Sequence, residues 1–444
     1  MSPSPPLPIS LSAENTDMSS LLIKNGHVVD PASGREGPFD VRIEDGRIQD
    51  VGKNLDPTGA EVVDATGLVV TPGLIDMHVH LREPGIEHSE TIETGARAAA
   101  AGGFTSICCM PNTLPVNDNA TVTNYIIERA RQHAVVNVFP IGAITKNSAG
   151  EELAAIGSMK NAGIVAISDD GRPVMNARVM RRAMQMAKSF DLPVIDHCED
   201  LNLSAGGDMH EGVQSTRLGL RGIPASSEDV MVARDILLAE STGAHFHVAH
   251  ISSRHSVNIV RFAKRQGLPV TCEATPHHFA LSDADITEYD SSYKMKPPLR
   301  SECDVAAVIE GIVAGTVDAI ATDHAPHPGS EKMQEFEKCP FGIIGLETAL
   351  ALSLEKLYHT QKISLMRLVE LFTTGPARIL GLNRGTLATG GPGDVTIFDP
   401  ELEWTYDVNR SYSKSKNSPF DGWQLRGGPV ATIVGGVVVW RRET

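Results

Sequence analysis

The sequence predicts an α/β protein: a TIM-type (β/α)8 barrel with a small β-sandwich domain built from the N- and C-terminal segments. Three observations support this prediction. Eight short apolar segments alternate with helix-like segments through the middle of the chain, which is typical of parallel βα units. Both ends of the chain are instead rich in short β-type runs. Histidine and aspartate follow several of the apolar segments, where a barrel places its functional groups.

The N-terminal β-type runs lie within residues 21–70. They are interrupted at Asn25-Gly26 and Asp45-Gly46, two dipeptides that favour hairpin turns. The C-terminal segment has the same character at 393–399 and 431–440. Two strand-rich ends around a different middle predict one β domain assembled from both termini. The predicted units are a flexible Pro/Ser-rich tail (1–20), the composite β domain (21–70 plus 383–444) and the catalytic barrel (71–382).

The apolar segments of the middle are the predicted barrel strands, because continuous apolar runs are typical of parallel strands buried on both faces. They are residues 74–80, 105–111, 136–143, 164–168, 193–197, 246–250, 269–272 and 318–322. The helix-like segments include residues 89–101, 119–133, 176–190, 226–241, 253–266 and 301–314. A doubly wound open sheet is the alternative. No Gly-rich dinucleotide or phosphate-loop motif follows any of these strands.

Composition excludes several classes of function. The 444 residues are 41% apolar and 21% charged, as in ordinary globular enzymes. The formal net charge of -16 predicts repulsion of phosphates, so we expect no nucleic acid partner and no membrane partner. Six cysteines without a CxxC spacing favour free thiols in a reducing cytoplasm. The first twenty residues resemble neither a signal nor a transit peptide, and no apolar run approaches the ~20 residues of a membrane span.

His78 and His80 stand two residues apart at the end of the first predicted barrel strand. Side chains two apart in a strand share one face, so these imidazoles can lie side by side as metal ligands. The pair alone is weak support, but other strand ends carry further candidates. These are Asp169 or Asp170 after the fourth strand, His197 after the fifth, His250 after the sixth and Asp323 after the eighth. Four histidines and two aspartates predict a two-metal hydrolytic site in which one carboxylate bridges the ions.

Strand alternation bears on two of these choices. His245 and His247 share one face of their strand and His250 lies on the other. They therefore cannot all point into the barrel, and His250 stands at the catalytic end. Asp169 and Asp170 also point to opposite faces, and alternation alone does not choose between them.

Five motifs together resemble the dihydroorotases of the larger bacterial type (class I) in the amidohydrolase superfamily. They are Asp-Met-His-Val-His-Leu-Arg-Glu-Pro-Gly (76–85), Met-Pro-Asn-Thr (110–113), Asp-His-Cys-Glu-Asp (196–200), Ala-Thr-Asp-His-Ala-Pro-His (321–327) and Pro-Phe-Gly (340–342). The resemblance extends from about residue 21 to the C-terminus. It implies reversible, zinc-dependent hydrolysis of (S)-dihydroorotate to N-carbamoyl-L-aspartate, the third step of de novo UMP biosynthesis, in the cytoplasm.

The resemblance also implies the metal ligands. His78, His80 and Asp323 would hold one zinc ion, and His197 and His250 would hold a second. Asp170 would bridge them, at the place where hydantoinases and the smaller dihydroorotases have a carboxylated lysine. One or two Zn2+ ions per chain are implied, and two are favoured. Asp323 would be the catalytic residue that carries a proton from the attacking hydroxide to the leaving nitrogen.

A second group of residues would bind the substrate. The resemblance implies His80, Arg82, Asn112, His327, Phe341 and Gly342, and Lys296 is a further candidate. Arg82 lies two residues beyond His80, and a guanidinium binds a carboxylate through two parallel hydrogen bonds. The family usually has asparagine where this chain has Lys296, and we expect the lysine to face the substrate.

Two other functions stay open. The first is another cyclic amidohydrolase, such as a hydantoinase (dihydropyrimidinase) or an allantoinase, although Arg82 and Asn112 favour an anionic substrate. The second is a non-catalytic, dihydroorotase-like partner of aspartate transcarbamoylase, although such chains have lost metal ligands that are present here. A homo-oligomer (dimer) and a complex with aspartate transcarbamoylase are the expected assemblies. The Gly-rich stretch 203–221 is either a mobile cover of the site or a surface excursion.

Overall fold

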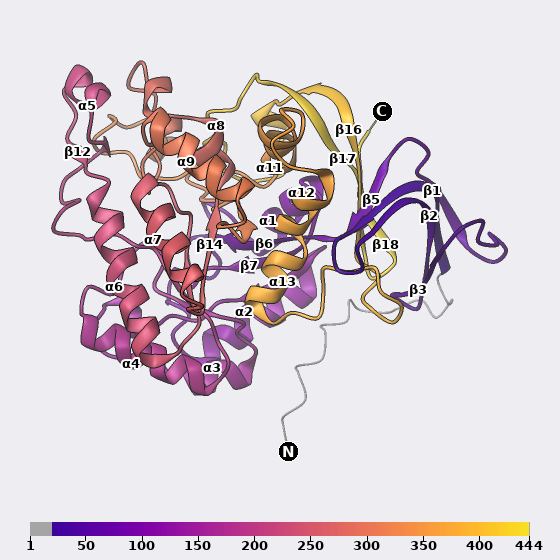
Figure 1. Cartoon of the computed structure of the whole chain (residues 1–444), viewed down its shortest axis with the longest axis horizontal. Helices are drawn as coiled ribbons and strands as arrows, with labels where there is room; N and C mark the ends of the chain where they lie inside the picture. The colour runs from indigo at the N-terminus through magenta and orange to yellow at the C-terminus, as the bar shows by residue number, and fades with distance from the viewer. Residues whose placement is uncertain (1–19, 444) are drawn as a thin grey trace.

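The computed structural model describes residues 20–443, so the predicted tail lies almost wholly outside the described residues. Eight parallel strands form the predicted barrel (Figure 1). They are β6 (Leu74–Val79), β7 (Phe104–Cys109), β8 (Asn137–Pro140), β9 (Ile167–Ser168), β10 (Val194–Asp196), β13 (Phe246–Val248), β14 (Val270–Ala274) and β15 (Ala319–Ile320). Two parallel bridges, Gly142 to Ile167 and Val79 to His324, join the two sheets into a closed ring. The predicted fold class is confirmed, and each predicted strand overlaps one of these.

Helices cover the outside of the strands (Figure 1). They include α1 (Ile92–Ala101), α2 (Ala120–His133), α3 (Ile156–Ala162), α4 (Ala177–Ser189), α6 (Ser226–Thr242), α7 (Arg254–Arg265), α9 (Glu302–Val313), α12 (Leu365–Phe372) and α13 (Thr374–Leu380). Helices α2, α4 and α7 begin directly after Asn119, Asn176 and Ser253. The side-chain oxygens of these residues accept hydrogen bonds from free N–H groups of the first turn. All six predicted helical segments are therefore present.

The barrel has two apolar layers. Phe104, Phe246 and their neighbours fill the space between strands and helices. A separate cluster includes Ile195 of β10 and Ala249 and Ala321, which directly follow β13 and β15; Ile379 and Leu380 of α13 belong to the same cluster. Polar side chains gather instead where the strands end, which is the face on which barrels carry their active sites.

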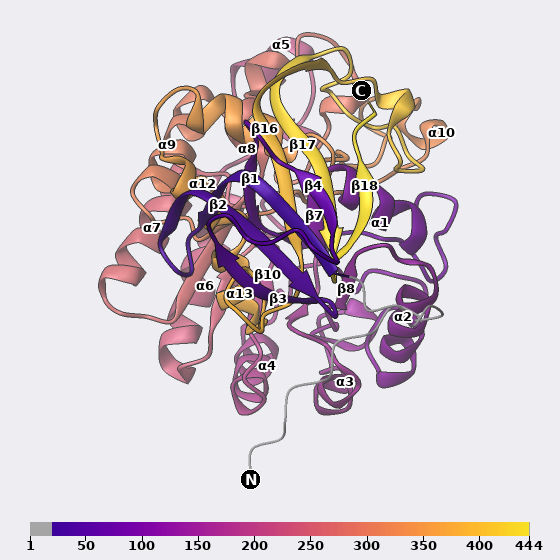
Figure 2. The ribbon, with the colours of Figure 1, turned by 90° about the vertical axis from the view of Figure 1, so that its right-hand side faces the viewer.

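The two ends of the chain form one eight-stranded sheet, shown toward the viewer in Figure 2. Its strands are β1 (Ser20–Asp30), β2 (Arg35–Glu44), β3 (Arg47–Gly52), β4 (Glu61–Asp64), β5 (Val69–Pro72), β16 (Val395–Thr405), β17 (Gln424–Val434) and β18 (Val437–Arg441). The N- and C-terminal parts meet where β5 pairs with β16, with Val70 opposite Ile397. A composite sheet is thus confirmed. The exact limits, 21–70 plus 383–444 and 71–382, stay a prediction.

The stretch 203–221 contains regular structure instead of an open loop. It includes β11 (Met209–His210) and α5 (Val213–Leu218), and β11 pairs with the short β12 (Gly222–Ile223). Its first residues line a pocket together with Lys296 and Phe341, so the stretch lies beside the predicted substrate residues.

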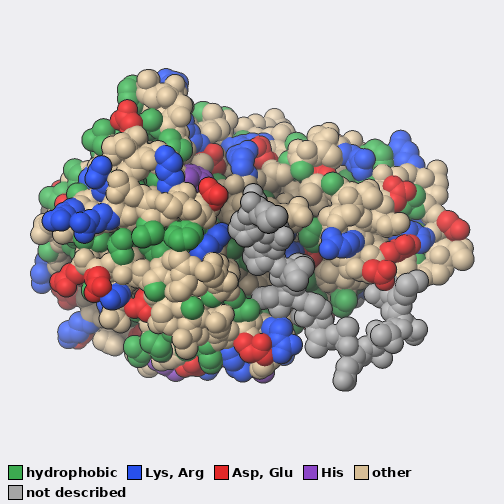
Figure 3. Space-filling model, turned by 90° about the horizontal axis from the view of Figure 1, so that it is seen from below, with side chains coloured by type: hydrophobic (Ala, Val, Ile, Leu, Met, Phe, Trp, Pro, Cys, Tyr) green, Lys and Arg blue, Asp and Glu red, His purple; other side chains and the backbone are tan. Residues whose placement is uncertain are grey.

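The surface carries charges of both signs. Figure 3 shows Lys and Arg side chains interspersed with Asp and Glu on the face that it presents. Within residues 20–443, none of the helices combines the length and apolar character that crossing a bilayer would require.

Candidate metal centre and active site

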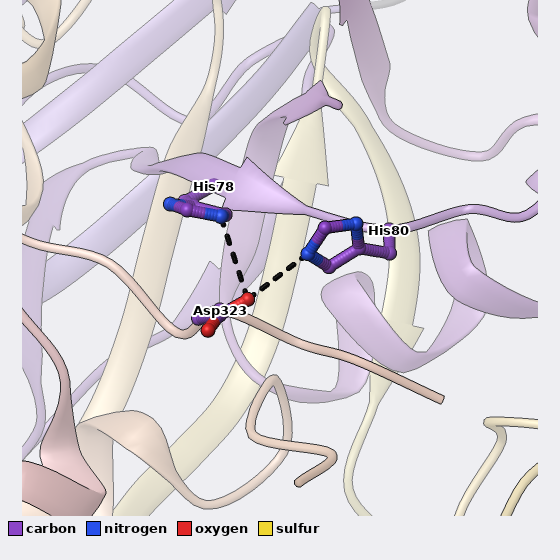
Figure 4. Close-up of side chains that lie close together, drawn as sticks. All are labelled: His78, His80 and Asp323. Carbon is purple, nitrogen blue, oxygen red and sulfur yellow. Dashed lines mark hydrogen bonds and ion pairs between the residues drawn. The ribbon is translucent and has the colours of Figure 1, made fainter. Parts of the chain in front are cut away.

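Three of the predicted ligands meet at the carboxyl end of the barrel. His78 lies near the end of β6, His80 is the first residue after it, and Asp323 follows β15. One carboxylate oxygen of Asp323 lies 3.0 Å from His80 Nε2 and 3.4 Å from His78 Nε2 (Figure 4). All three side chains are buried, and their donor atoms lie within 4.8 Å of one another. This spacing suits three ligands of one metal ion.

Asp170 lies between this group and a second pair of histidines. Its Oδ1 is 3.4 Å from His78 Nε2, and its Oδ2 is 3.4 Å from His80 Nε2. The same Oδ1 is 3.6 Å from His250 Nε2 and 3.8 Å from His197 Nδ1. A carboxylate in this place can serve two ions at once. The six predicted ligands therefore converge, and their role as ligands stays a prediction.

The neighbouring Asp169 points away from this cluster. Its carboxylate accepts hydrogen bonds from the N–H groups of Ile144 and Thr145 and from the Thr145 hydroxyl. Asp169 therefore holds a neighbouring loop, and the geometry makes the choice between the two aspartates that strand alternation left open.

His247 and His250 both belong to the buried polar cluster, although strand alternation predicts opposite faces for them. His247 is fully buried, with its Nε2 3.3 Å from Glu273 Oε2. Strand β13 ends at Val248, and His250 has a φ of 33°, so the alternation stops before it. Arg82 and Asp323 also have positive φ values, 59° and 45°. Such backbone strain concentrates at functional sites.

Hydrogen bonds fix the orientation of three histidines. The Nδ1 atoms of His78 and His80 lie 2.7 Å from Glu273 Oε1 and 2.9 Å from Asn112 Oδ1. His197 Nε2 lies 3.1 Å from Glu199 Oε2. Since these oxygens can only accept, each ring carries its hydrogen on that side. The other ring nitrogen of each histidine therefore presents its lone pair to the cluster, as metal-binding histidines do.

The donor atoms fit a pair of divalent ions. His78 Nε2 and Asp170 Oδ1 are buried without a hydrogen-bond partner among the described residues. Buried lone pairs directed at one another cost free energy unless a cation or a proton lies between them. Imidazole nitrogens and carboxylate oxygens are the donors that Zn2+ accepts, and a shared carboxylate offsets the repulsion between two ions.

Asp323 is held in its charged form. Burial raises the pKa of its carboxyl group, but the His78, His80 and His250 imidazoles lower this pKa by more than burial raises it. The pKa of Asp323 therefore lies well below the usual range. A carboxylate at this position can accept a proton at neutral pH.

Arg82, Asn112 and His327 lie around the same centre. Arg82 Nε donates to the Pro326 carbonyl at 3.3 Å, and its Nη2 lies 3.4 Å from His327 Nε2. Burial and the Arg82 guanidinium lower the pKa of His327 to about 3, so this imidazole is neutral and can accept from Arg82. Asn112 contacts His80 as described above. The structure thus brings the three predicted substrate residues together.

Lys296 lies beside Glu199, and the Phe341-Gly342 pair lies between Lys296 and His327. Lys296 Nζ donates to Glu199 Oε2 at 3.0 Å and lies 5.0 Å from the centre of the Phe341 ring. Gly342 has a φ of 155°, and a Cβ there would lie 2.7 Å from the His327 ring. Only glycine fits so close to His327. Contact of these residues with the substrate stays a prediction.

Comparison with known proteins places the chain. A family model described as "Dihydro-orotase-like" matches residues 67–256. The dihydroorotase of Solibacter usitatus (strain Ellin6076) is 69% identical over 424 residues, which cover 96% of this chain and 99% of that protein. The chain belongs to the dihydroorotase family. The dihydroorotase of Pelotomaculum thermopropionicum is 57% identical and covers 94% of this chain and 98% of its own length.

Solved structures outside the dihydroorotases share the fold. The L-hydantoinase (dihydropyrimidinase) from Arthrobacter aurescens superposes with a TM-score of 0.87 at 25% identity, over 96% of this chain and 97% of that chain. The dihydropyrimidinase from Brevibacillus agri NCHU1002 gives 0.84 at 26% identity, over 95% of each chain. Cyclic amidohydrolases of different specificity thus share this architecture, and the residues of the site must decide between them.

Sequence reasoning missed the acidic side chains behind the ligands of this dihydroorotase-family site. Glu273 contacts Nδ1 of His78, Glu199 contacts Nε2 of His197, and Glu90 contacts Nε2 of the neighbouring His324. Asp76, two residues before His78, accepts from the Thr322 side chain and joins β6 to the segment after β15. The sequence pointed to two of these residues only by their positions. Asp76 opens the motif that contains His78, and Glu199 stands two residues after His197.

Replacing Glu273 with glutamine is expected to weaken metal binding. Both of its oxygens are engaged, by His78 and His247, and their hydrogen bonds lower the pKa of Glu273 to about 2 despite its burial, which raises it. An amide is a weaker acceptor, so we expect zinc affinity to fall about 10- to 100-fold. Competition with a chelator measures this, with exposed Glu302→Gln on α9 as control. Equal affinities for both variants and the parent would contradict the expectation.

Proposed function

We propose that this chain is a dihydroorotase that interconverts (S)-dihydroorotate and N-carbamoyl-L-aspartate by hydrolysis and closure of the ring amide. The observation that carries the proposal is the convergence of six metal-type ligands beside the guanidinium of Arg82. An anionic ring amide needs both parts, because its carboxylate requires a fixed cation and its carbonyl requires polarisation.

We infer that the metal is zinc, with two ions per chain favoured over one. His78, His80 and Asp323 would hold the first ion, His197 and His250 the second, and Asp170 both. When bound, such ions polarise a carbonyl oxygen and make hydroxide available near neutral pH.

Asp323 would move the proton. As the water oxygen bonds to the ring carbonyl carbon, Asp323 accepts the proton that the nucleophile loses. It then delivers that proton to the ring nitrogen as the C–N bond breaks. In the reverse direction Asp323 takes the proton from the carbamoyl nitrogen, which bonds to the carboxyl carbon as water leaves. Its lowered pKa keeps the Asp323 carboxylate unprotonated before each transfer.

The remaining residues would hold the substrate. The Arg82 guanidinium would bind its carboxylate, with Asn112 and His327 as further partners. Lys296, Phe341 and Gly342 would contact the ring from the other side, and the ion pair of Lys296 with Glu199 supports its place at the catalytic face. By the resemblance, Asp170 would stand where hydantoinases have a carboxylated lysine, which favours dihydroorotate over hydantoins as substrate.

The cellular setting is also part of the proposal. The family assignment supports a place in the third step of UMP biosynthesis, in the cytoplasm. A homodimer and a complex with aspartate transcarbamoylase are the assemblies that we propose, and size-exclusion chromatography with light scattering, with and without that enzyme, tests both.

Replacing Arg82 with glutamine is expected to raise the KM for dihydroorotate. A hydrogen-bonded pair of opposite charges contributes about 1.5–3 kcal/mol, so the rise should be about 10- to 100-fold. Steady-state kinetics on dihydroorotate, dihydrouracil, hydantoin and allantoin measure it. Exposed Arg97→Gln on α1 is the control. Equal turnover of the uncharged rings by the parent protein would contradict the proposed substrate.

A further inference from the structure

Asn417 connects two loops of the catalytic face from outside the barrel. It lies in the long connection between β16 and β17 and is only 4% exposed. Its Nδ2 donates to the carbonyls of Ala325 at 2.9 Å and Gly342 at 3.0 Å. Its Oδ1 accepts from the His327 N–H at 3.1 Å, and its own carbonyl accepts from the Ile344 N–H at 3.0 Å. One buried side chain therefore uses both amide hydrogens and its oxygen on these loops.

The partners of Asn417 allow only one orientation of its amide. Carbonyl oxygens accept and the His327 N–H donates, so Nδ2 must face Ala325 and Gly342 while Oδ1 faces His327. No isosteric side chain supplies two donors and one acceptor in this pattern. The substitution Asn417→Asp would keep the acceptor and lose both donors.

The two loops are those that carry predicted substrate residues. The first includes Ala325 and His327 after β15, and the second includes Phe341 and Gly342. The loops contact each other directly, because the Ala325 N–H donates to the Ile343 carbonyl at 2.9 Å. They pack so closely that a Cβ on Gly342 would lie 2.6 Å from the Ala325 oxygen. A shift of either loop therefore displaces the other.

The same connection has a second attachment near the proton-transfer residue. The Ser413 hydroxyl and the Lys414 N–H donate to Glu90. Glu90 Oε2 also lies 3.3 Å from Nε2 of His324, the residue after Asp323. His324 Nδ1 accepts from the Gly345 N–H at 3.2 Å, which places the ring hydrogen on Nε2, toward Glu90. The connection is thus attached at both ends of the segment from Asp323 to His327.

We propose that Asn417 is a positioning residue for the reaction, which fixes His327 relative to the backbone of Gly342. Asn417 would keep His327, which would bind the substrate carboxylate, at a fixed distance from Gly342, which would contact the ring. The inference rests on the proposed function, because it takes His327 and Gly342 as substrate contacts. It also makes the C-terminal β16–β17 connection a part of the active site.

A double-mutant cycle with His327 tests the proposal. We expect Asn417→Ala to raise the KM for dihydroorotate about 10- to 100-fold, since a displacement near 1 Å can cost about 100-fold. Zinc content should stay at the parent value. In the His327→Ala background the same change should raise KM less than about threefold, because Asn417 acts through His327. The matched control is Asn409→Ala, at an exposed position in the same connection, which should leave both the KM and the zinc content unchanged.

The alternative outcomes are distinct. Two results would overturn the positioning role. One is a double variant whose rise in KM equals the product of the rises in Asn417→Ala and His327→Ala. The other is an unchanged KM for folded Asn417→Ala. If Asn417→Ala does not fold, Asn417→Asp is judged by the same cycle, since it keeps the volume and the acceptor for the His327 N–H. Failure of the proposed function would look different, because the parent protein itself would not turn over dihydroorotate.

Discussion

Replacing Asp323 with asparagine is expected to lower kcat for dihydroorotate by about 1,000-fold in both directions. Asparagine keeps an oxygen beside His78 and His80 but cannot take up a proton, and positioned acid–base groups contribute about 10²- to 10⁴-fold. Initial rates at saturating substrate, measured on protein of verified metal content, test this. The exposed Asp50→Asn on β3 serves as control. A variant with more than a tenth of the parent kcat would remove Asp323 from the proton transfer.

Replacing Asp170 with alanine should have the second large effect, on metal binding itself. Asp170 is the carboxylate whose oxygens lie within 3.8 Å of all four histidines, so both ions would lose a ligand. Bound zinc should fall from two ions per chain to one or fewer. The zinc affinity should fall by more than about 100-fold, the upper end of the loss typical when a residue that hydrogen-bonds to a metal ligand is replaced. Elemental analysis after dialysis measures the loss.

The adjacent aspartate provides a matched control for that experiment. Asp169 holds Ile144 and Thr145 and points away from the histidine cluster, so Asp169→Asn should lower thermal stability and leave the zinc content unchanged. Zinc loss in Asp169→Asn with retention in Asp170→Ala would contradict the assignment of the bridging position.

The barrel and its catalytic end could be predicted because strand order and strand polarity are local properties of the chain. Each apolar run fixes a strand, and parallel strands must end on one face, so the sequence alone was enough to place His78, His197 and Asp323 together. The composite sheet could be predicted for a similar reason, since hairpin dipeptides and β-type runs mark both ends of the chain.

The rest of the site depends on contacts that one-dimensional patterns do not encode. Alternation failed at His250 because β13 stops at Val248 and a positive φ turns the next residues. Glu273 lies on β14, which β15 separates from β6, and Asn417 lies in the connection between β16 and β17, so they contact the site across 195 and 75 or more residues of sequence. Pairings of that range are set by the register of strands and by loop packing.

The fold itself does not set the substrate. Hydantoinases and dihydropyrimidinases share the architecture, so specificity must come from the side chains of the site, and we propose Arg82 as one of them. This is why the substrate panel of the Arg82 experiment discriminates between cyclic amidohydrolases, whereas a closer superposition would not.

The most direct test of the account is anomalous diffraction at the zinc edge from crystals of the zinc-loaded protein that hydrolyses dihydroorotate. The account predicts two peaks in each chain, one beside His78, His80 and Asp323 and one beside His197 and His250, with Asp170 reaching both. Active crystals without a peak among these side chains would contradict it.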